Sequence, residues 1–399
     1  MKFTDTRPVI EMSQYDVVVV GGGIGGIAAA VAAAREGAKT ILLEKQINLG
    51  GLGTVGLISW YEPLCDGNGK KMISGIGEEL IKLAIKYGFD NLHSDWGGKS
   101  KNTPSTSRYA TFYSPMSFSL ALDEYVRESG ADIRFDTLAS YPVMDGNACL
   151  GVMAETASGK EFYPAKMIVD ATGDASICYR AGMPTMKGEN VLAYVTHGFG
   201  KDQVDNYDSE KDLLEFRKWN WIAASSYEDK NDGTLTDSSG TTSDSVNEFI
   251  AKGKAAALEF IKSKDKDNYE LLSIPTMPQF RMIRHIVGET ILDGSEDGKT
   301  NFTDSVGCFS DFRRLNTHYQ LPYSTLYNKQ FPNILAAGRI ISAHGEGWQI
   351  TRVIPVCALT GQVSGTAAAL AVKSKCACSD ININELRNTL KNSNCILEF

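Results

Sequence analysis

At residues 15–44 the chain reads YDVVVVGGGIGGIAAAVAAAREGAKTILLE, and this stretch decides the fold that the sequence predicts. The β-branched run Asp16–Val20 predicts a strand that is buried on both faces. An alanine-rich helix follows, and a second predicted strand, Thr40–Leu43, ends directly before Glu44. Strand, helix and strand in this order predict an α/β fold that opens with a βαβ unit.

Glycines in the turn between the first strand and the helix have the spacing G-x-G-x-x-G, at Gly21, Gly23 and Gly26. Gly21 allows a tight turn, Gly23 lets the backbone approach a pyrophosphate, and Gly26 lets helix and strand pack closely. The helix N-terminus adds unpaired N–H groups and a dipole that favours anions. Since Glu44 is placed to accept hydrogen bonds from a ribose diol, we predict a dinucleotide site rather than a glycine-rich turn of an ordinary βαβ unit.

Composition and charge argue against two classes of partner. The 399 residues suffice for about two to three domains, and 43% hydrophobic with 22% charged residues is ordinary for a globular protein. The net charge of −8 gives no electrostatic support for a nucleic-acid partner. Residues 17–34 carry no charge, but five glycines and a change from strand to helix periodicity favour a buried βαβ unit over a membrane span.

The cysteines and the N-terminus favour a cytoplasmic protein. Eight cysteines are scattered without a C-x-x-C pair, so we expect neither a redox-active dithiol nor a metal or iron–sulfur loop. Cys376, Cys378 and Cys395 are interpreted as free thiols rather than as metal ligands. The N-terminal sequence lacks the apolar core of a signal peptide, so we expect a reducing compartment and no export.

Two further segments have the composition of ligand-binding turns. The run GGLGTVG at residues 50–56 lies shortly after Glu44, where backbone contact with a ligand is favoured over a tight turn alone. The predicted strand Met167–Val169 runs into Thr172-Gly173-Asp174, where backbone and a carboxylate can reach a ligand at the strand's carboxyl end. Between these segments, four short alternating runs from residue 132 to 163 predict a β-meander.

The rhythm of strands and helices is lost after residue 190 and returns near Asn333. Residues 227–248 form a polar segment typical of a lid or mobile excursion, and Ser245-x-x-Glu248 predicts a capping box for a helix at Phe249–Lys262. After Asn333 come a buried strand, a turn at Gly338-Arg339 and an apolar helix from about Ile354 to Val372. We therefore expect a discontinuous nucleotide-binding domain at 1–190 and 331–399, and a mixed α+β substrate or cap domain at 191–330.

With these residues in view, the chain resembles the FAD-dependent oxidoreductases of the glutathione-reductase type, in the branch with one FAD domain and a variable substrate domain. The resemblance is carried mainly by Tyr15–Gly56, Ile168–Gly182 and Gly338–Ala371. It implies a Rossmann-type FAD-binding domain with FAD as the cofactor. By this match the FAD contacts are Gly21, Gly23 and Gly26 at the pyrophosphate with Gly25 beside them, Glu44 at the adenosine ribose with Lys45 next to it, Gly50, Gly51, Gly53 and Thr54 along the pyrophosphate and the flavin edge, Thr172, Gly173 and Asp174 in a second flavin motif, and Gly338, Arg339, Thr351 and Arg352 near the flavin ring.

The resemblance also implies how the protein tunes the flavin. The late helix would point its N-terminus at the isoalloxazine ring, so that unpaired N–H groups and Arg352 stabilise the anionic reduced flavin and raise its potential as an electron acceptor. A second G-x-G-x-x-G unit and the dithiol of disulfide reductases are both missing. We therefore expect no built-in NAD(P)H domain, and the electron partner stays unknown: oxygen, a quinone, another flavoprotein or a transiently bound nicotinamide.

Four residues are candidates for catalysis, each with a structural alternative. His344 is a candidate base or hydrogen-bond donor near flavin N5, or a histidine that caps loop carbonyls. Arg352 is a candidate flavin-site cation, or an ion-pair partner of Glu346. Arg284 is a candidate for binding a substrate carboxylate, or a surface charge, and Tyr323 is a candidate pocket residue, or a core tyrosine.

We expect an enzyme: an FAD-dependent dehydrogenase or oxidase that exchanges hydride between flavin N5 and a small organic metabolite. A flavin-dependent reductase of an unsaturated acid is the next hypothesis. An electron-transfer subunit and a non-redox biosynthetic flavoprotein are the alternatives from other classes. The expected partner is a small-molecule substrate, and a homo-oligomer is left open.

Overall fold

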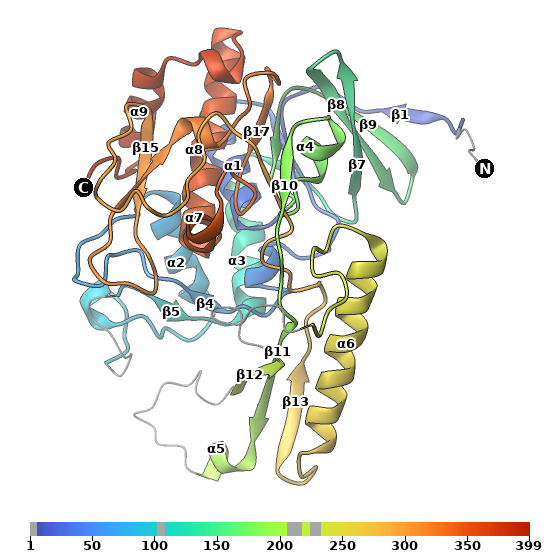
Figure 1. The fold of residues 1–399 in the computed structure, drawn as a ribbon, viewed down its shortest axis with the longest axis vertical. Coiled ribbons are helices and arrows are strands. Elements are labelled where there is room, and N and C mark those ends of the chain that lie inside the picture. Colours follow the sequence, from blue (N-terminus) through green and yellow to red (C-terminus); the bar gives the residue numbers. More distant parts are fainter. Residues whose placement is uncertain (1–5, 102–107, 206–217, 224–232) are drawn as a thin grey trace.

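A computed structural model describes residues 6–101, 108–205, 218–223 and 233–399. Its largest sheet, the main sheet, has the strand order β6-β3-β2-β9-β8-β7. The strands β7, β8 and β9 of this sheet are labelled in Figure 1. Val18 pairs with Ile41 on one side and with Ile168 on the other, so the β-branched run lies in the middle of the sheet, as predicted. The parallel part comprises β2 (Tyr15–Val20), β3 (Thr40–Leu43), β6 (Asp132–Arg134), the end of β9 (Gly159–Asp170) and β17 (Ile334–Ala336).

Side chains alternate between the two faces of the main sheet and divide the core into two layers. Val17 and Val19 point into a cluster that contains the helices α1 (Ile24–Arg35) and α8 (Ile354–Ser374). The helices α2 (Ile76–Lys86) and α3 (Pro115–Glu128) complete this layer. Val18 and Val20 point to the other face, where the antiparallel strands and α4 (Ser176–Arg180) cover them.

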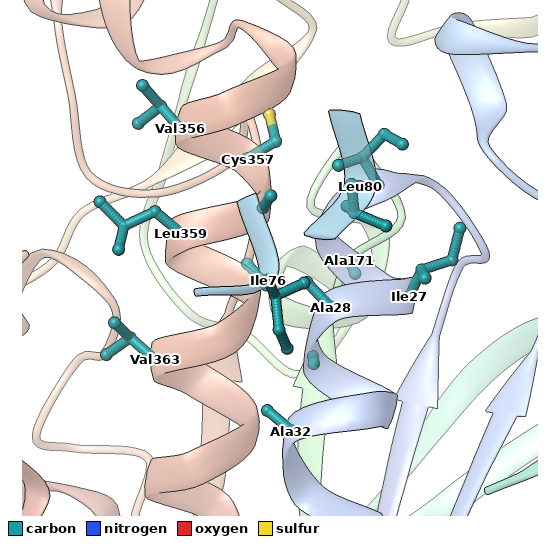
Figure 2. Close-up of a cluster of buried hydrophobic side chains, with 14 of the residues drawn as sticks. Ile27, Ala28, Ala32, Ile76, Leu80, Ala171, Val356, Cys357, Leu359 and Val363 are labelled. Atoms are coloured by element: carbon teal, nitrogen blue, oxygen red, sulfur yellow. The ribbon is translucent and has the colours of Figure 1, made fainter. Parts of the chain in front are cut away.

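The closest helix pair is α1 with α8, and small residues make it possible. Cβ atoms added at Gly361 and Gly365 would lie 2.1 Å from the carbonyl oxygens of Gly25 and Ala29. Figure 2 shows Ala28 on the side of α1 that faces α8. Among the described residues, α8 alone is long and apolar enough to cross a membrane, but 89% of its most apolar window is buried, as in a core helix.

The antiparallel part of the main sheet differs from the prediction in one respect. The strands β7 (Leu138–Asp145) and β8 (Ala148–Thr156) form a meander with β9. The runs predicted as separate strands near residues 161–163 and 167–169 are one continuous strand, β9, which pairs with β8 and then with β2. The first predicted meander strand is β6, which belongs to the parallel part. The strand β1 (Val9–Glu11), which we did not predict, pairs with β9.

A smaller antiparallel sheet has the order β12 (Lys218–Ala223), β11 (Ala193–Gly200) and β13 (Tyr269–Ser273), and the helix α6 (Ser243–Lys262) packs on it (Figure 1). Tyr194, Ile222 and Phe249 lie in its separate core. We call this sheet, α6 and the chain from β13 to Ile283 the small unit. The capping box of α6 is Thr242 with Ser245, so the predicted box at Ser245-x-x-Glu248 is wrong by one turn. The predicted polar segment 227–248 lies partly outside the described residues.

The chain after Ile283 returns to the main core. The strand β14 (Arg284–Ile286) pairs with β10 (Thr185–Lys187), and β15 (Ser305–Phe309) pairs with β16 (Tyr319–Pro322). Val306 and Leu321 lie in the cluster that contains α1 and α8. The boundary at residue 330 stays a prediction, but this packing favours a small unit that ends near Ile283. Short elements complete the chain: β4 (Trp60–Tyr61), β5 (Thr111–Phe112), α5 (Lys201–Asp205), α7 (Gly345–Thr351) and α9 (Ile383–Asn392).

Candidate active site

A cavity of about 370 Å³ lies at the carboxyl ends of β2, β3 and β9. Open α/β sheets bind their ligands at this edge. Both cores contribute to its wall, because Met277, Pro278 and Phe280 of the small unit line it together with loops of the main sheet. Most of the predicted cofactor contacts also line it: Gly21, Gly23, Gly25, Glu44, Lys45, Gly50, Gly51, Gly53, Thr172, Gly173, Asp174, Gly338, Arg339 and Arg352.

The glycine turn after β2 forms one end of the cavity. Gly21 has φ +100°, and a Cβ there would lie 2.6 Å from the carbonyl oxygen of Ala171. A Cβ at Gly23 would meet no atom within 4 Å, so the backbone at this position faces open space. Gly23 is also the N-cap of α1 and carries no side-chain cap, which leaves the first N–H groups of α1 available to an anion.

Glu44 lies beside this turn, with its carboxylate held by the backbone. Its Oε2 accepts a hydrogen bond of 2.5 Å from the N–H of Gly22, and its Oε1 accepts one of 2.7 Å from the N–H of Gln46. Burial raises the pKa of Glu44, although these N–H groups oppose the shift. The orientation of the carboxylate is therefore fixed before any ligand binds.

The loop Gly50–Gly53, the cofactor loop, lies against the glycine turn. The N–H of Gly50 donates to the carbonyl of Gly22 at 2.8 Å, and Gly50 has φ +102°. Thr54 does not line the cavity, since its hydroxyl donates to the carbonyl of Leu49 at 2.5 Å. The predicted FAD contact at Thr54 is therefore wrong, because its hydroxyl forms a hydrogen bond within the loop.

The second motif, Thr172-Gly173-Asp174, is held by a buried carboxylate that our sequence analysis missed. Asp170 accepts hydrogen bonds from the N–H and the hydroxyl of Thr172, at 3.0 and 2.7 Å, and from the N–H of Cys178 at 2.8 Å. The guanidinium of Arg339 donates from Nε to the carbonyl of Gly173 at 2.7 Å. Asp170 is the last residue of the buried strand β9. An acidic residue at the end of a buried strand is the sequence feature that could have identified it.

Arg352 and the start of α8 form the other end of the cavity. Arg352 ends the short helix α7, which we did not predict, and donates from Nε and Nη2 to Oε1 of Gln349 at 3.0 and 2.6 Å. Arg352, Ile354 and Cys357 all line the cavity. Thr351 does not, because its hydroxyl donates to the carbonyl of Gly347 within α7 at 2.8 Å, so its predicted cofactor contact is wrong.

Gly26 does not line the cavity either, and it acts through packing. A Cβ at Gly26 would lie 1.8 Å from the carbonyl oxygen of Gly21, so only glycine fits between helix and turn. The resemblance implies a pyrophosphate contact at Gly26, but in the structure Gly26 has this packing role instead.

Three of the four catalytic candidates lie away from the cavity wall. Tyr323 is buried, and its hydroxyl donates to the carbonyl of Cys378 at 2.8 Å, so the prediction that it lines the pocket is wrong. Arg284 lies over the ring of Tyr179 at 4.5 Å and donates to the carbonyls of Asp174 and Thr241, at 3.4 and 3.2 Å. Arg284 therefore stabilises the second motif through the carbonyl of Asp174 and does not contribute to the cavity wall. The exposed His344 is the N-cap residue of α7 and stays an untested candidate.

Sequence reasoning missed the wall that the small unit provides. Met277, Pro278, Phe280 and Ile283 line the cavity, but they lie in a segment without strand or helix periodicity. Nothing in their spacing distinguishes them from an ordinary loop. Cys357 lies in the first turn of α8, which was predicted, yet a cysteine in an apolar helix is usually a core residue. Within the described residues, no group of three or more His, Cys, Asp or Glu side chains could hold a metal ion.

The residues of the cavity fit FAD. A backbone cradle with a free helix end suits a pyrophosphate, a fixed carboxylate next to it suits a ribose diol, and an arginine at a helix start suits the ring that accepts negative charge. When bound there, FAD supplies the redox chemistry, and the chain supplies binding, orientation and charge.

Comparisons with known proteins agree with this fit. A profile of FAD dependent oxidoreductases matches residues 16–243 and 235–390. A geranylgeranyl bacteriochlorophyll reductase-like protein from Thermoplasma acidophilum is similar over 96% of this chain and 82% of its own, with 15% identity and a TM-score of 0.51. The p-nitrophenol 4-monooxygenase from Pseudomonas putida is similar over 96% and 89%, with 12% identity and a TM-score of 0.48.

The profile does not single out the glutathione-reductase type among flavin enzymes, and the similarity to the Thermoplasma acidophilum structure, at 15% identity, shows the fold alone. The cofactor of the family is FAD. The profile match extends over most of the chain, including every loop of the cavity on the main-sheet side. The chain therefore belongs to the FAD dependent oxidoreductases.

Proposed function

We propose that this protein is a dehydrogenase or oxidase that exchanges hydride between flavin N5 and a small organic metabolite. The observation that carries the proposal is the double wall of the cavity. One wall is the cradle for FAD, and the other consists of Met277, Pro278 and Phe280 of the small unit, of which Phe280 belongs to the separate core. A substrate placed between these walls lies against the cofactor on one side and against the side chains of Met277, Pro278 and Phe280 on the other.

Charged side chains of both signs line this cavity, and two of its arginines, Arg352 and Arg339, bear on the reaction. Arg352 is oriented by Gln349 at the start of α8, where the helix has no side-chain N-cap. A cation and a helix N-terminus at one point stabilise negative charge that develops during reduction. Their orientation is set before reaction, so no reorganisation is needed when the charge appears.

Arg339 favours a second candidate function, the reduction of an unsaturated acid. Its guanidinium lines the cavity, and no carboxylate in the described part of the chain lies within ion-pair distance of it. Burial lowers the pKa of Arg339, yet an arginine stays protonated in a protein. A cation without a carboxylate partner suits an anionic group of the ligand, and a substrate carboxylate is one such group. The similarity to a reductase-like protein is compatible with this direction of reaction.

The test is anaerobic titration of the purified, FAD-loaded protein. For a dehydrogenase or oxidase, a metabolite from a panel of alcohols, amines and acids bleaches the flavin absorption band. For the second candidate, the panel leaves the oxidised band unchanged, and an unsaturated acid restores the band after reduction with dithionite. If neither occurs, the proposal fails, and an electron-transfer subunit or a non-redox flavoprotein is the better hypothesis. A cytoplasmic location and a diffusible electron partner belong to the same proposal.

A further inference from the structure

The segment Val55–Leu57, the clamp segment, directly follows the cofactor loop and has an unusual backbone. Leu57 has φ +60°, a conformation that residues with a side chain rarely adopt, and its side chain is 4% exposed. Such a conformation persists only when the surroundings hold it in place. The contacts that hold the clamp segment in this conformation therefore indicate its structural role.

Three consecutive carbonyls of the clamp segment accept hydrogen bonds from the small unit. The carbonyl of Val55 accepts from the N–H of Thr276 at 3.0 Å. The carbonyl of Gly56 accepts from Nε2 of Gln279 at 2.6 Å. The carbonyl of Leu57 accepts from Nε2 of His197 at 3.1 Å, and since a carbonyl only accepts, Nε2 of His197 carries a proton.

Gln279 also ties the small sheet itself to this contact. Its Oε1 accepts from the N–H of Val195 in β11 at 2.7 Å, and the side chain is 2% exposed. One buried amide thus joins the middle strand of the small sheet to the clamp segment. His197 is equally buried and lies in the same strand.

On its other side, the clamp segment is bonded to the cofactor loop. The N–H of Gly56 donates to the carbonyl of Gly51 at 3.1 Å, and the N–H of Ile58, the residue directly after the clamp segment, donates to the carbonyl of Leu52 at 2.9 Å. Gly51 and Leu52 both line the cavity. The hydrogen bonds therefore run without interruption from the small sheet to the wall of the cofactor site.

We infer that the small unit fixes the shape of the cofactor loop through the clamp segment, and that Gln279 and His197 are positioning residues for FAD. Neither side chain lines the cavity, so both act through the loop. The inference concerns FAD binding and does not depend on the proposed substrate. The affinity and spectrum of FAD test the inference, whereas the anaerobic titration tests the proposed function. The alternative is that these hydrogen bonds only join two cores.

The experiment compares two buried glutamines that make similar contacts. Gln362 is also 2% exposed, accepts from the N–H of Ile76 at 2.9 Å and donates to the carbonyl of Ser393 at 3.4 Å, away from the clamp segment. The variants Gln279→Leu and Gln362→Leu are measured for melting temperature without ligand, for the dissociation constant of FAD, and for the visible absorption spectrum of bound FAD.

We expect both variants to melt at lower temperature. Only Gln279→Leu weakens FAD binding, by about tenfold, and shifts the flavin band, whereas Gln362→Leu stays within about twofold of the parent protein. Equal FAD affinities and spectra in both variants would overturn the inference. Should Gln279→Leu not fold, the pair His197→Leu and His197→Gln replaces it: glutamine keeps a donor for the carbonyl of Leu57, so it restores the parent spectrum and leucine does not. The same spectrum and affinity in both His197 variants would also overturn it.

Discussion

The helices α8 and α6 are both long and both cover a sheet, yet they pack in opposite ways. On α8, Gly361 brings backbone against backbone, because an added Cβ would lie 2.1 Å from the carbonyl oxygen of Gly25. On α6, Phe249 fills the small core, and a Cβ at Gly253 would meet the ring of Tyr194 at 2.3 Å. A peptide group in the centre of a fold cannot move aside, whereas a side chain can change its rotamer.

This difference separates the two tasks of the molecule. The cofactor side needs backbone groups at fixed places, and glycines provide them at Gly21, Gly25 and Gly338, all at the cavity wall. The small unit contributes side chains, such as those of Met277 and Phe280, rather than backbone groups. The main sheet therefore provides the backbone groups that contact FAD, although we infer that the small unit positions one of these loops. In our proposal the side chains of the small unit choose the substrate.

The largest effect that tests this comparison is on stability. Gly361→Ala should lower the free energy of unfolding by about 2–3 kcal/mol, because overpacking against a rigid carbonyl exceeds the gain in helix propensity. Gly253→Ala should lower it by less, about 1 kcal/mol, because the added methyl group meets the ring of a side chain, which can shift, rather than a carbonyl oxygen of the backbone. Urea unfolding followed by circular dichroism measures both. Similar losses in the two variants would contradict the distinction between backbone and side-chain packing.

The next effect concerns Asp311, which lies in the chain that returns to the main core. Asp311 is fully buried, and its carboxylate accepts from Nε of Arg313 at 3.2 Å and from Nε of Arg314 at 2.7 Å. Asp311→Asn should cost about 1–2 kcal/mol at neutral pH. The exposed pair of Glu259 with Lys262 on α6 is the matched control, and Glu259→Gln should cause no measurable loss.

The pH dependence of this difference has a definite sign. Burial by itself would raise the pKa of Asp311, but the hydrogen bonds and charges of Arg313 and Arg314 outweigh it and hold the pKa below its ordinary value. A carboxyl with a lower pKa in the folded state stabilises the fold above its unfolded pKa of about 3.9 and loses this contribution as pH falls through the folded pKa. Melting curves of Asp311→Asn and the parent protein should therefore converge below about pH 4, and a constant gap would refute this account.

The cofactor side could be predicted from sequence because its determinants are local. A glycine that must turn the chain, or an acid at the end of a strand, is visible within a few residues, and so the turn at Gly21, the acid Glu44 and the start of α8 near Ile354 all lie at the cavity. The strong hydrophobic pattern of β2 also fixed the order of the first elements.

The parts that failed depend on partners far along the chain. Tyr323 was a reasonable pocket residue by type, but the carbonyl of Cys378 takes its hydroxyl, and no local signal reveals that partner. Thr351 is a cofactor contact by the family resemblance alone, whereas the structure uses its hydroxyl within α7, in a hydrogen bond to the carbonyl of Gly347. The small-unit wall depends on how two cores meet, and sequence periodicity contains no information about that contact.

A smaller effect is expected on cofactor affinity. Glu44→Ala should weaken FAD binding by about tenfold, or about 1.4 kcal/mol, because the carboxylate that is held by Gly22 and Gln46 no longer reaches the ribose. Glu44→Gln keeps one acceptor oxygen and should lie between alanine and the parent protein. Fluorescence titration of the apoprotein with FAD measures the dissociation constants. An unchanged constant in Glu44→Ala would contradict the ribose assignment.

The smallest expected effect is on the reduction potential of the flavin. It distinguishes FAD binding, at the Glu44 end of the cavity, from charge stabilisation, at the Arg352 end. Arg352→Met removes the cation that Gln349 orients at the start of α8, while the helix N-terminus stays in place. We expect the two-electron potential to fall by about 20 mV, or about 1 kcal/mol, with FAD affinity nearly unchanged. Arg352→Lys keeps a positive charge without the bidentate contact to Gln349 and should recover most of the potential. Spectroelectrochemical titration measures these values, and a potential equal to the parent's in Arg352→Met would show that the helix end alone sets the charge environment.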